Sequence, residues 1–154
     1  MSLSKFGEKL ELRSEVEIAA EPAQIWDKIT DFSAISSWNP YIVRASGVLA
    51  RGEHIDLIVC PPGGRELKVR RRIDVLLKGE ELRWTGRYGW GFLLRGEQYF
   101  QLRSANSPGR TRLTVGENLL GPGVTGNNQT VLNIARGLAL MNQALKRQLE
   151  VHNG

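Results

Sequence analysis

Three polar residues that could bind or transform a ligand, Arg71, Gln98 and Glu117, stand inside otherwise apolar extended segments. Successive side chains of a strand point to opposite faces, so each of the three is predicted to share a face with apolar residues two positions away. A glutamate in an apolar pocket can act as a general base, and Arg71, Tyr88 or Tyr41 can assist it. The pattern predicts a pocket with apolar walls and a few convergent polar groups, as small-molecule sites have.

The turns between the extended segments predict which side chains meet. We pair the segments about turns at 106–109, 89–91 and Gly79. These pairings place the polar residues toward one end of a sheet and leave the other end apolar. A slip of one residue would turn every one of them outward. The predicted neighbours are Gln98 with Glu117, Phe100 with Val115, Trp84 with Gln98, and Arg71 with Tyr88.

Three interpretations of Arg71 and Glu117 stay open at this point. The two residues form a buried ion pair that serves the structure alone, because a lone buried charge is costly. Alternatively, Glu117 lies at an open rim in water, or both residues contact a ligand. Gly86 and Gly96 belong to the same neighbourhood. They either create volume for a cavity or let the sheet bend.

The elements that position these groups follow from hydrophobic periodicity. Apolar residues recur every three or four positions from Val131 to Leu149, which predicts a long terminal helix with one apolar stripe. Pro22 is suited to the first turn of a short helix, and 32–38 favours a second one. Short links between the extended segments predict an antiparallel meander. The predicted strands are 12–18, 41–48, 55–59, 67–77, 81–88, 94–102 and 112–119.

This order predicts an α+β fold in which a curved antiparallel sheet of about seven strands wraps around the long C-terminal helix. The concave face of the sheet is the large apolar surface that can cover the stripe of the helix. A chain of 154 residues fits one domain, so we expect a single ligand-binding domain over 1–154, with 1–11 as a flexible N-terminus.

The composition of the chain limits the classes of binding partner that we expect. The net charge of +5 suits nucleic acid or an anionic membrane surface, but the densest basic cluster, 70–72, lies inside a strand pattern. We therefore expect no nucleic acid and at most weak peripheral membrane contact. No apolar run approaches the ~18 residues of a transmembrane helix. Cys60 is the single cysteine, which indicates a reducing, cytoplasmic compartment. The pattern predicts no particular oligomeric state.

Several chemistries are set aside. Two histidines, His54 and His152, and one cysteine are too few for a His/Cys metal site, so we expect no metal and no other cofactor. The segment 121–126 is glycine-rich but lacks the Lys-Ser/Thr of a phosphate loop, and we interpret it as a hinge before the long helix. Trp90, in the turn 89–92, is expected to fold over the cavity mouth or to form an exposed tip.

The order of several motifs resembles the START-like helix-grip superfamily (SRPBCC), in particular its polyketide cyclase/dehydrase and lipid-transport branch. The motifs are 20–26, 31–32, 38–40, 61–64, 81–84 and Gly121, so the resemblance covers nearly the whole chain. It implies a cavity between sheet and helix. It does not imply a reaction, since the superfamily includes lipid carriers, hormone and allergen-type binders, aromatase/cyclases and ubiquinone-binding proteins, and a fold does not fix a function.

The first hypothesis is a carrier or binding protein for a small hydrophobic molecule such as a lipid, a quinone or an aromatic polyketide-like compound. The rival is a cyclase or dehydratase-like enzyme with Glu117 as the acid/base, and a third is a peripheral partner of a membrane or protein. The predicted ligand-binding residues are Trp38, Tyr41, Leu57, Val59, Arg71, Trp84, Tyr88, Gln98, Phe100, Val115, Glu117, Leu138, Met141 and Asn142.

Overall fold

The computed structural model describes residues 9–88, 94–121, 124 and 128–153. The strands form one antiparallel sheet in the order β1-β7-β6-β5-β4-β3-β2. The elements are β1 (Lys9–Ile18), α1 (Pro22–Thr30), η1 (Phe32–Ser37), β2 (Ile42–Gly47), β3 (His54–Val59), β4 (Leu67–Leu77), β5 (Glu81–Tyr88), β6 (Arg95–Ser104), β7 (Thr111–Leu120) and α2 (Gln129–Asn153).

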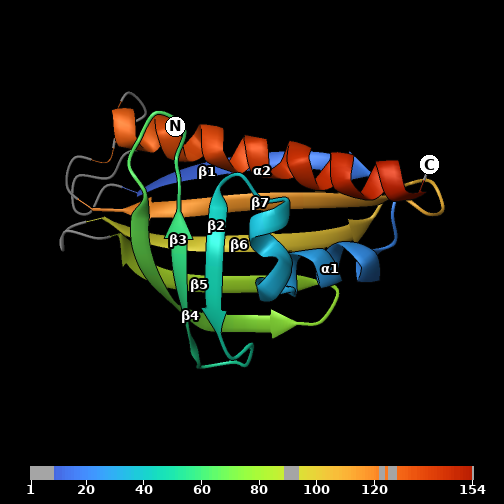
Figure 1. Cartoon of the computed structure of the whole chain (residues 1–154), viewed down its shortest axis with the longest axis horizontal. Helices are drawn as coiled ribbons and strands as arrows, with labels where there is room; N and C mark the ends of the chain where they lie inside the picture. The colour runs from blue at the N-terminus through green and yellow to red at the C-terminus, as the bar shows by residue number, and fades with distance from the viewer. Residues whose placement is uncertain (1–8, 89–93, 122–123, 125–127, 154) are drawn as a thin grey trace.

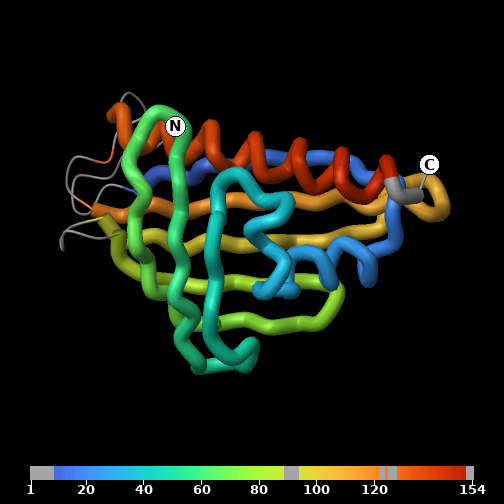
Figure 2. Tube along the Cα trace, in the orientation of Figure 1, coloured from blue at the N-terminus to red at the C-terminus, as the bar shows by residue number. Residues whose placement is uncertain are grey.

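The sheet curls around α2, as the sequence predicted. Figures 1 and 2 show α2 lying along β1, while β2 and β3 cross in front of the long strands from the other edge of the sheet. The helix buries the predicted stripe, whose members include Ile134, Leu138, Met141 and Leu145. Apolar area removed from water stabilises this arrangement by roughly 1.5–3 kcal/mol for each fully buried side chain of this size.

Two short helical elements connect β1 to β2, and both were predicted. Pro22 occupies the first turn of α1, and the backbone nitrogen of Glu21 donates to the Gln24 side chain at 3.0 Å. Trp26 lies in the buried face of α1. The second element, η1, is a 3-10 helix. After it, the side-chain oxygen of Asn39 accepts hydrogen bonds from the backbone nitrogens of Tyr41 (2.9 Å) and Ile42 (2.8 Å), which fixes the start of β2.

Most predicted pairings across the sheet are confirmed. Gln98 lies opposite Glu117, Phe100 lies opposite Val115, and Trp84 lies opposite Gln98. The polar side chains therefore lie on the concave face, among the apolar ones. The register that the turns predicted holds across these three strands.

The β4–β5 register contains an irregularity that the sequence analysis missed. The prediction that Arg71 lies opposite Tyr88 was wrong. The pairing of Leu77 with Glu81 at the turn would place Arg71 opposite Arg87, and the shift between Ile73 and Val75 moves it by one further residue, to Gly86. The shift also ends the simple alternation. Leu77 is 52% exposed, contrary to its predicted inward position, and Leu76 packs against the core instead.

The start of the chain also differs from the prediction. The first strand begins at Lys9, so the last three residues of the segment expected to be flexible, 9–11, belong to the sheet. Trp90 and most of the expected hinge at 121–126 lie outside the described residues.

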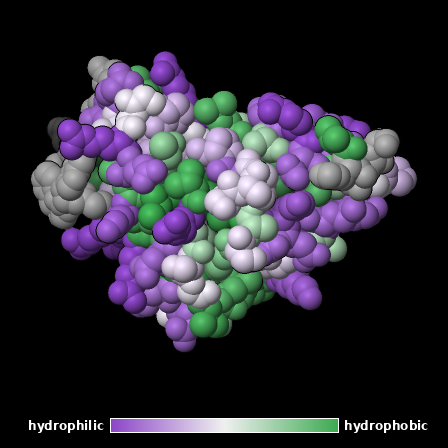
Figure 3. Space-filling view, viewed as in Figure 1, coloured by the Kyte–Doolittle hydropathy of each residue, from purple (hydrophilic) through white to green (hydrophobic). Residues whose placement is uncertain are grey.

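The surface is mixed in character. On the face shown in Figure 3, hydrophilic residues cover most of the molecule and hydrophobic residues show between them. Among the described residues, no helix is long and apolar enough to cross a membrane.

Candidate functional site

A buried ion pair holds one end of the concave face together. Nη2 of Arg71 donates to Oε2 of Glu117 at 3.0 Å, and the two side chains are 1% and 0% exposed. The same nitrogen donates to the Tyr88 hydroxyl at 3.0 Å, and Nη1 donates to the carbonyl of Gly96 at 2.6 Å. The Tyr88 hydroxyl in turn donates to Oε2 of Glu117. Of the three interpretations, the rim position in water is therefore wrong, and the buried ion pair is present.

We call Arg71, Tyr88, Glu117 and Tyr41 the polar cluster. Burial and neighbouring charges shift the pKa values of its arginine and its two tyrosines. Burial by itself would lower the pKa of Arg71, but the charge and hydrogen bond of Glu117 together with Tyr88 and Tyr41 outweigh it, and the pKa is raised. Burial raises the pKa of Tyr88 well above its usual value, and the negative charge of Glu117 adds to the effect. The pKa of Tyr41 is raised by the same two causes. The cluster therefore keeps a charged pair beside neutral phenols.

Gly96 makes room for the polar cluster. A side-chain carbon added there would overlap the Glu117 carboxylate, and it would lie 3.0 Å from Nη1 of Arg71 and 3.0 Å from the ring of Tyr88. At Gly86 it would overlap the backbone carbonyl of Arg70. The space that these glycines leave is thus occupied by the ion pair and by backbone, so they do not enlarge a cavity.

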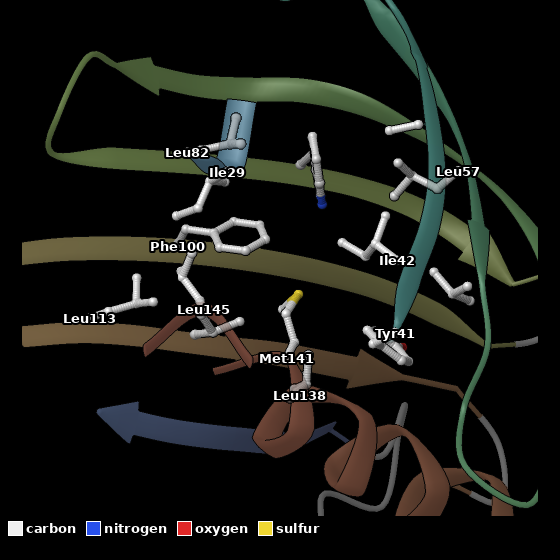
Figure 4. Packing of buried hydrophobic residues seen from close by; sticks show 14 of the residues in the cluster. Ile29, Tyr41, Ile42, Leu57, Leu82, Phe100, Leu113, Leu138, Met141 and Leu145 are labelled. Atoms are coloured by element: carbon white, nitrogen blue, oxygen red, sulfur yellow. The ribbon is translucent and has the colours of Figure 1, made fainter. Parts of the chain in front are cut away.

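A small cavity lies between the middle of the sheet and α2. Its volume is about 10 Å³, enough for roughly one water molecule. Figure 4 shows Met141 reaching from α2 into the space between Phe100 and Ile42. Trp84 packs edge-on against Phe100, with ring centroids 5.8 Å apart. The lining residues are Ile29, Ile35, Trp38, Asn39, Ile42, Trp84, Phe100, Leu113, Val115, Met141, Asn142 and Leu145.

Two buried amide side chains stand near this cavity. Oε1 of Gln98 accepts a hydrogen bond from Nε1 of Trp84 at 2.7 Å. Nδ2 of Asn142 donates to the backbone carbonyl of Ser14 at 3.1 Å. Each amide thus anchors one of its two polar atoms.

Several buried polar atoms lack a hydrogen-bond partner among the described residues. A buried polar atom without a partner costs about 1–3 kcal/mol, so such atoms are uncommon and indicate either an ordered water or a ligand. The atoms are Trp38 Nε1, Tyr41 Oη, Arg71 Nε, Gln98 Nε2, Glu117 Oε1 and Asn142 Oδ1.

The fourteen predicted site residues fall into four sets. Six of them line the cavity: Trp38, Trp84, Phe100, Val115, Met141 and Asn142. Four form the polar cluster, and Gln98 is buried beside Trp84. The other three, Leu57, Val59 and Leu138, are buried in the core and do not line the cavity.

Half of the residues in the cavity wall were not predicted as site residues from the sequence. Asn39 entered the sequence analysis only within the motif 38–40, yet its side chain lines the cavity while its oxygen accepts hydrogen bonds from two backbone nitrogens. Ile35 and Ile42 come from η1 and β2, whose position over the sheet is a tertiary feature. The asparagine before Pro40 was the available signal, because such residues commonly order turns with their side chains.

The described residues contain no group of three or more His, Cys, Asp or Glu side chains placed to hold a metal ion. The polar side chains that the structure describes at this site can form hydrogen bonds in an apolar environment.

Comparison with known proteins agrees with this architecture. Residues 9–150 match the family described as polyketide cyclase/dehydrase and lipid transport. None of the curated proteins is similar enough to this chain to match it.

Solved structures share the fold at low sequence identity. A START superfamily protein from Mycobacterium smegmatis has a TM-score of 0.71 at 22% identity, over 91% of this chain and 97% of that one. Protein Mll3558 from Rhizobium loti has a TM-score of 0.73 at 16% identity, over 93% and 99%. DynU16, a protein of the dynemicin biosynthetic locus, has a TM-score of 0.70 at 20% identity, over 91% of this chain and 47% of that one. With the family match over nearly its whole length, the chain belongs to the polyketide cyclase/dehydrase and lipid transport family.

Proposed function

We propose that the protein binds a small, mostly apolar molecule between the curved sheet and α2, as a binding protein or carrier. The observation that carries the proposal is the side chain of Asn142. It is 1% exposed, it lines an apolar cavity, and its Oδ1 atom has no partner among the described residues. An acceptor left in that state favours a ligand that supplies the missing hydrogen bond. The family's description, which includes lipid transport, is consistent with this role.

Binding requires the cavity to grow. About 10 Å³ does not admit a lipid or an aromatic compound, so side chains of the wall must move when the ligand enters. Met141 is suited to such a movement, because an unbranched thioether side chain adapts to irregular spaces. Trp38 is half-buried and lines the cavity from the end of η1, so it is a second candidate for movement.

An enzyme that uses Glu117 as its base is the rival, and the family's description also includes cyclases and dehydrases. A general base must reach the proton that it removes. Glu117 is bound to Arg71 and Tyr88 and is absent from the cavity wall. This geometry favours binding over catalysis. Under the rival, Glu117→Gln abolishes turnover and leaves ligand affinity intact. Under the proposal, no turnover depends on Glu117.

The proposal is tested by native mass spectrometry of the purified protein and by titration with the uncharged apolar dye N-phenyl-1-naphthylamine. We expect a co-purifying small molecule, or saturable dye binding after delipidation. Met141→Phe adds bulk inside the cavity and should weaken dye binding several-fold. The matched control is Leu140→Phe on the same helix, at a position that is 48% exposed. Equal affinities of the two variants would contradict the proposed site.

Three further expectations stay predictions beside this proposal. The chain acts as one ligand-binding domain over 1–154, it is located in the cytoplasm, and its contact with membranes is weak and peripheral. Flotation with anionic and neutral vesicles at several salt concentrations tests the last of these, because electrostatic contact weakens as salt rises.

A further inference from the structure

The orientation of the Gln98 amide is fixed by its partner. An indole nitrogen can only donate a hydrogen bond, so the atom of Gln98 that lies 2.7 Å from Trp84 Nε1 must be the oxygen. The NH₂ group therefore points the other way, and it has no partner among the described residues. Gln98, which is 1% exposed and is not part of the cavity lining, thus has a free hydrogen-bond donor that a ligand can reach only when the cavity grows past Phe100.

The orientation of the Asn142 amide is fixed by the opposite kind of partner. A backbone carbonyl can only accept, so the atom that lies 3.1 Å from the Ser14 oxygen must be the NH₂ group of Asn142. Its oxygen is left without a partner within the described part of the chain, and the residue is one of those that line the cavity. Asn142 thus presents an acceptor, and the two amides present complementary groups.

The sheet places the two amides around one pair of cavity residues. Gln98 is the inward-facing neighbour of Phe100 along β6, and Phe100 pairs with Val115 across β7. Ser14, which anchors Asn142, pairs with Val115 on its other side. Phe100 and Val115 both line the cavity. Trp38 Nε1, a further donor without a described partner, belongs to the same wall.

We propose that the polar group of the ligand is a neutral hydroxyl, of an alcohol or a phenol, which accepts a hydrogen bond from Gln98 and donates one to Asn142. This inference rests on the proposed function and names the ligand class. A quinone or another carbonyl accepts but does not donate, so it leaves the Asn142 oxygen unpaired. A carboxylate fails in the same way and places a negative charge against that oxygen. An ammonium group cannot accept from Gln98. A hydroxyl matches both amides.

The test compares two probes that share one ring system. 2-Naphthol both donates and accepts, whereas 2-methoxynaphthalene keeps the acceptor and loses the hydrogen. Titration calorimetry on the full chain gives the ratio of their dissociation constants, and we expect 2-naphthol to bind about tenfold more tightly. In Asn142→Leu the ratio should fall toward one, and in the matched control Leu140→Ala it should stay as in the wild type. Both dissociation constants are measured on the same variant, so a general loss of stability affects them equally and leaves their ratio unchanged.

Equal binding of the two probes by the wild type would overturn the hydroxyl assignment while the proposed cavity stands, and would assign the free amide atoms to an ordered water. A ratio unchanged by Asn142→Leu would overturn the role of Asn142. If that variant does not fold, Gln98→Met tests the other half of the proposal. It removes the donor that both probes accept from, so both should bind more weakly while their ratio stays as in the wild type, and unchanged affinities would overturn the role of Gln98. If neither probe nor the apolar dye binds, the proposed function itself falls, and the inference falls with it.

Discussion

The polar cluster and the cavity occupy the same concave face, but they satisfy their polar atoms in different ways. In the cluster, Arg71, Tyr88 and Glu117 bind one another. In the cavity, Asn142 is anchored through one atom and left open at the other. The cluster is rich in polar groups that bind one another, although Arg71 Nε, Glu117 Oε1 and Tyr41 Oη lack a partner among the described residues. The cavity is almost wholly apolar and keeps its few polar atoms available.

The difference indicates that the number of polar residues is a poor guide to the site. The cluster attracts attention in the sequence because charged residues are rare inside a sheet. In a buried ion pair each charge is held by its partner, and the pair fixes the arrangement of the strands around it. A lone amide in an apolar wall is less conspicuous, yet it has the unmet hydrogen bond that recognition uses. Four experiments sharpen this contrast.

The largest effect is expected from Glu117→Gln, which removes the charge that pairs with Arg71. An unpaired buried arginine should lower the free energy of unfolding by about 3–5 kcal/mol. Urea denaturation measures this loss. The matched control is Glu97→Gln, because Glu97 pairs with Arg83 at 2.8 Å on the same sheet but its side chain is 37% exposed, and the loss there should stay below about 1 kcal/mol.

Replacing both partners, as Arg71→Met with Glu117→Leu, should recover most of the stability and leave dye binding intact. A double variant that is stable but no longer binds the dye would show that the cluster belongs to the ligand site.

The next largest effect concerns the cavity. Met141→Ala should lower the free energy of unfolding by about 2–5 kcal/mol, because it removes buried atoms and leaves a space behind. The same change should strengthen binding of small apolar probes, since an apolar cavity of larger volume accepts them. Leu140→Ala, one position away and 48% exposed, controls for helix propensity. A loss of stability without any gain in binding would place the ligand elsewhere.

A smaller effect is expected at the glycine that accommodates the polar cluster. Gly96→Ala forces a carbon against Glu117, Arg71 and Tyr88, and it should cost about 1–3 kcal/mol as overpacking does. Gly64→Ala is the control, because the added carbon would lie 3.4 Å from the nearest atom, the Pro61 carbonyl, and the change should stay within about 0.5 kcal/mol. Thermal unfolding of the two variants compares them directly. Equal losses would mean that the cluster can shift to make room.

The smallest effect at neutral pH belongs to the tyrosines. Burial raises the pKa of Tyr88 and of Tyr41 above the value of about 10 that they have when unfolded. The stability linked to their neutral form is therefore fully present below pH 10 and is lost as the pH rises through the folded pKa. Burial and a hydrogen bond to Glu11 raise the pKa of Tyr99 to about 12.

Tyrosinate absorbance should therefore stay low at pH 10 in the folded protein. As the pH rises further, Tyr99 should ionise first, so Tyr99→Phe should remove the first increase in absorbance. Tyr88→Phe should reduce the loss of stability above pH 10. Two tyrosines that titrate near pH 10 while the protein remains folded would contradict the burial of the cluster. The described lining of the cavity contains no titratable side chain, so probe binding should not change with pH while the fold persists.

Sequence periodicity was sufficient for the sheet, the long helix and the pairing of Gln98 with Glu117. The β6–β7 turn sets that register, and both strands continue without a bulge. Periodicity failed to predict the register of β4, where the irregularity beside Ile73 moves Arg71 opposite Gly86. No glycine marks the shift, and the pair Leu76 and Leu77 is apolar at both positions, so alternation could not detect it.

The cavity was predictable only in part for a similar reason. Residues of the sheet and of α2 could be assigned from alternation and helical spacing, which gave Phe100, Val115 and Asn142. Asn39, Ile35 and Ile42 line the cavity because η1 and β2 fold back across the sheet. Local sequence patterns do not encode this tertiary arrangement. The free atoms of the two amides emerged only from the partners that their other atoms bind.

The order of the strands has a consequence for how the molecule can open. The edge strands β1 and β2 both approach α2, with α2 lying along β1 (Figure 1). On the β2 side, the ring of Tyr41 packs against Gly137, and no backbone hydrogen bond joins β2 or η1 to α2 within the described ranges. A ligand that enters between β2 and α2 separates apolar side chains and leaves the backbone hydrogen bonds of the sheet intact. Its rate of entry should respond to heat and to excluded osmolytes, and be indifferent to salt.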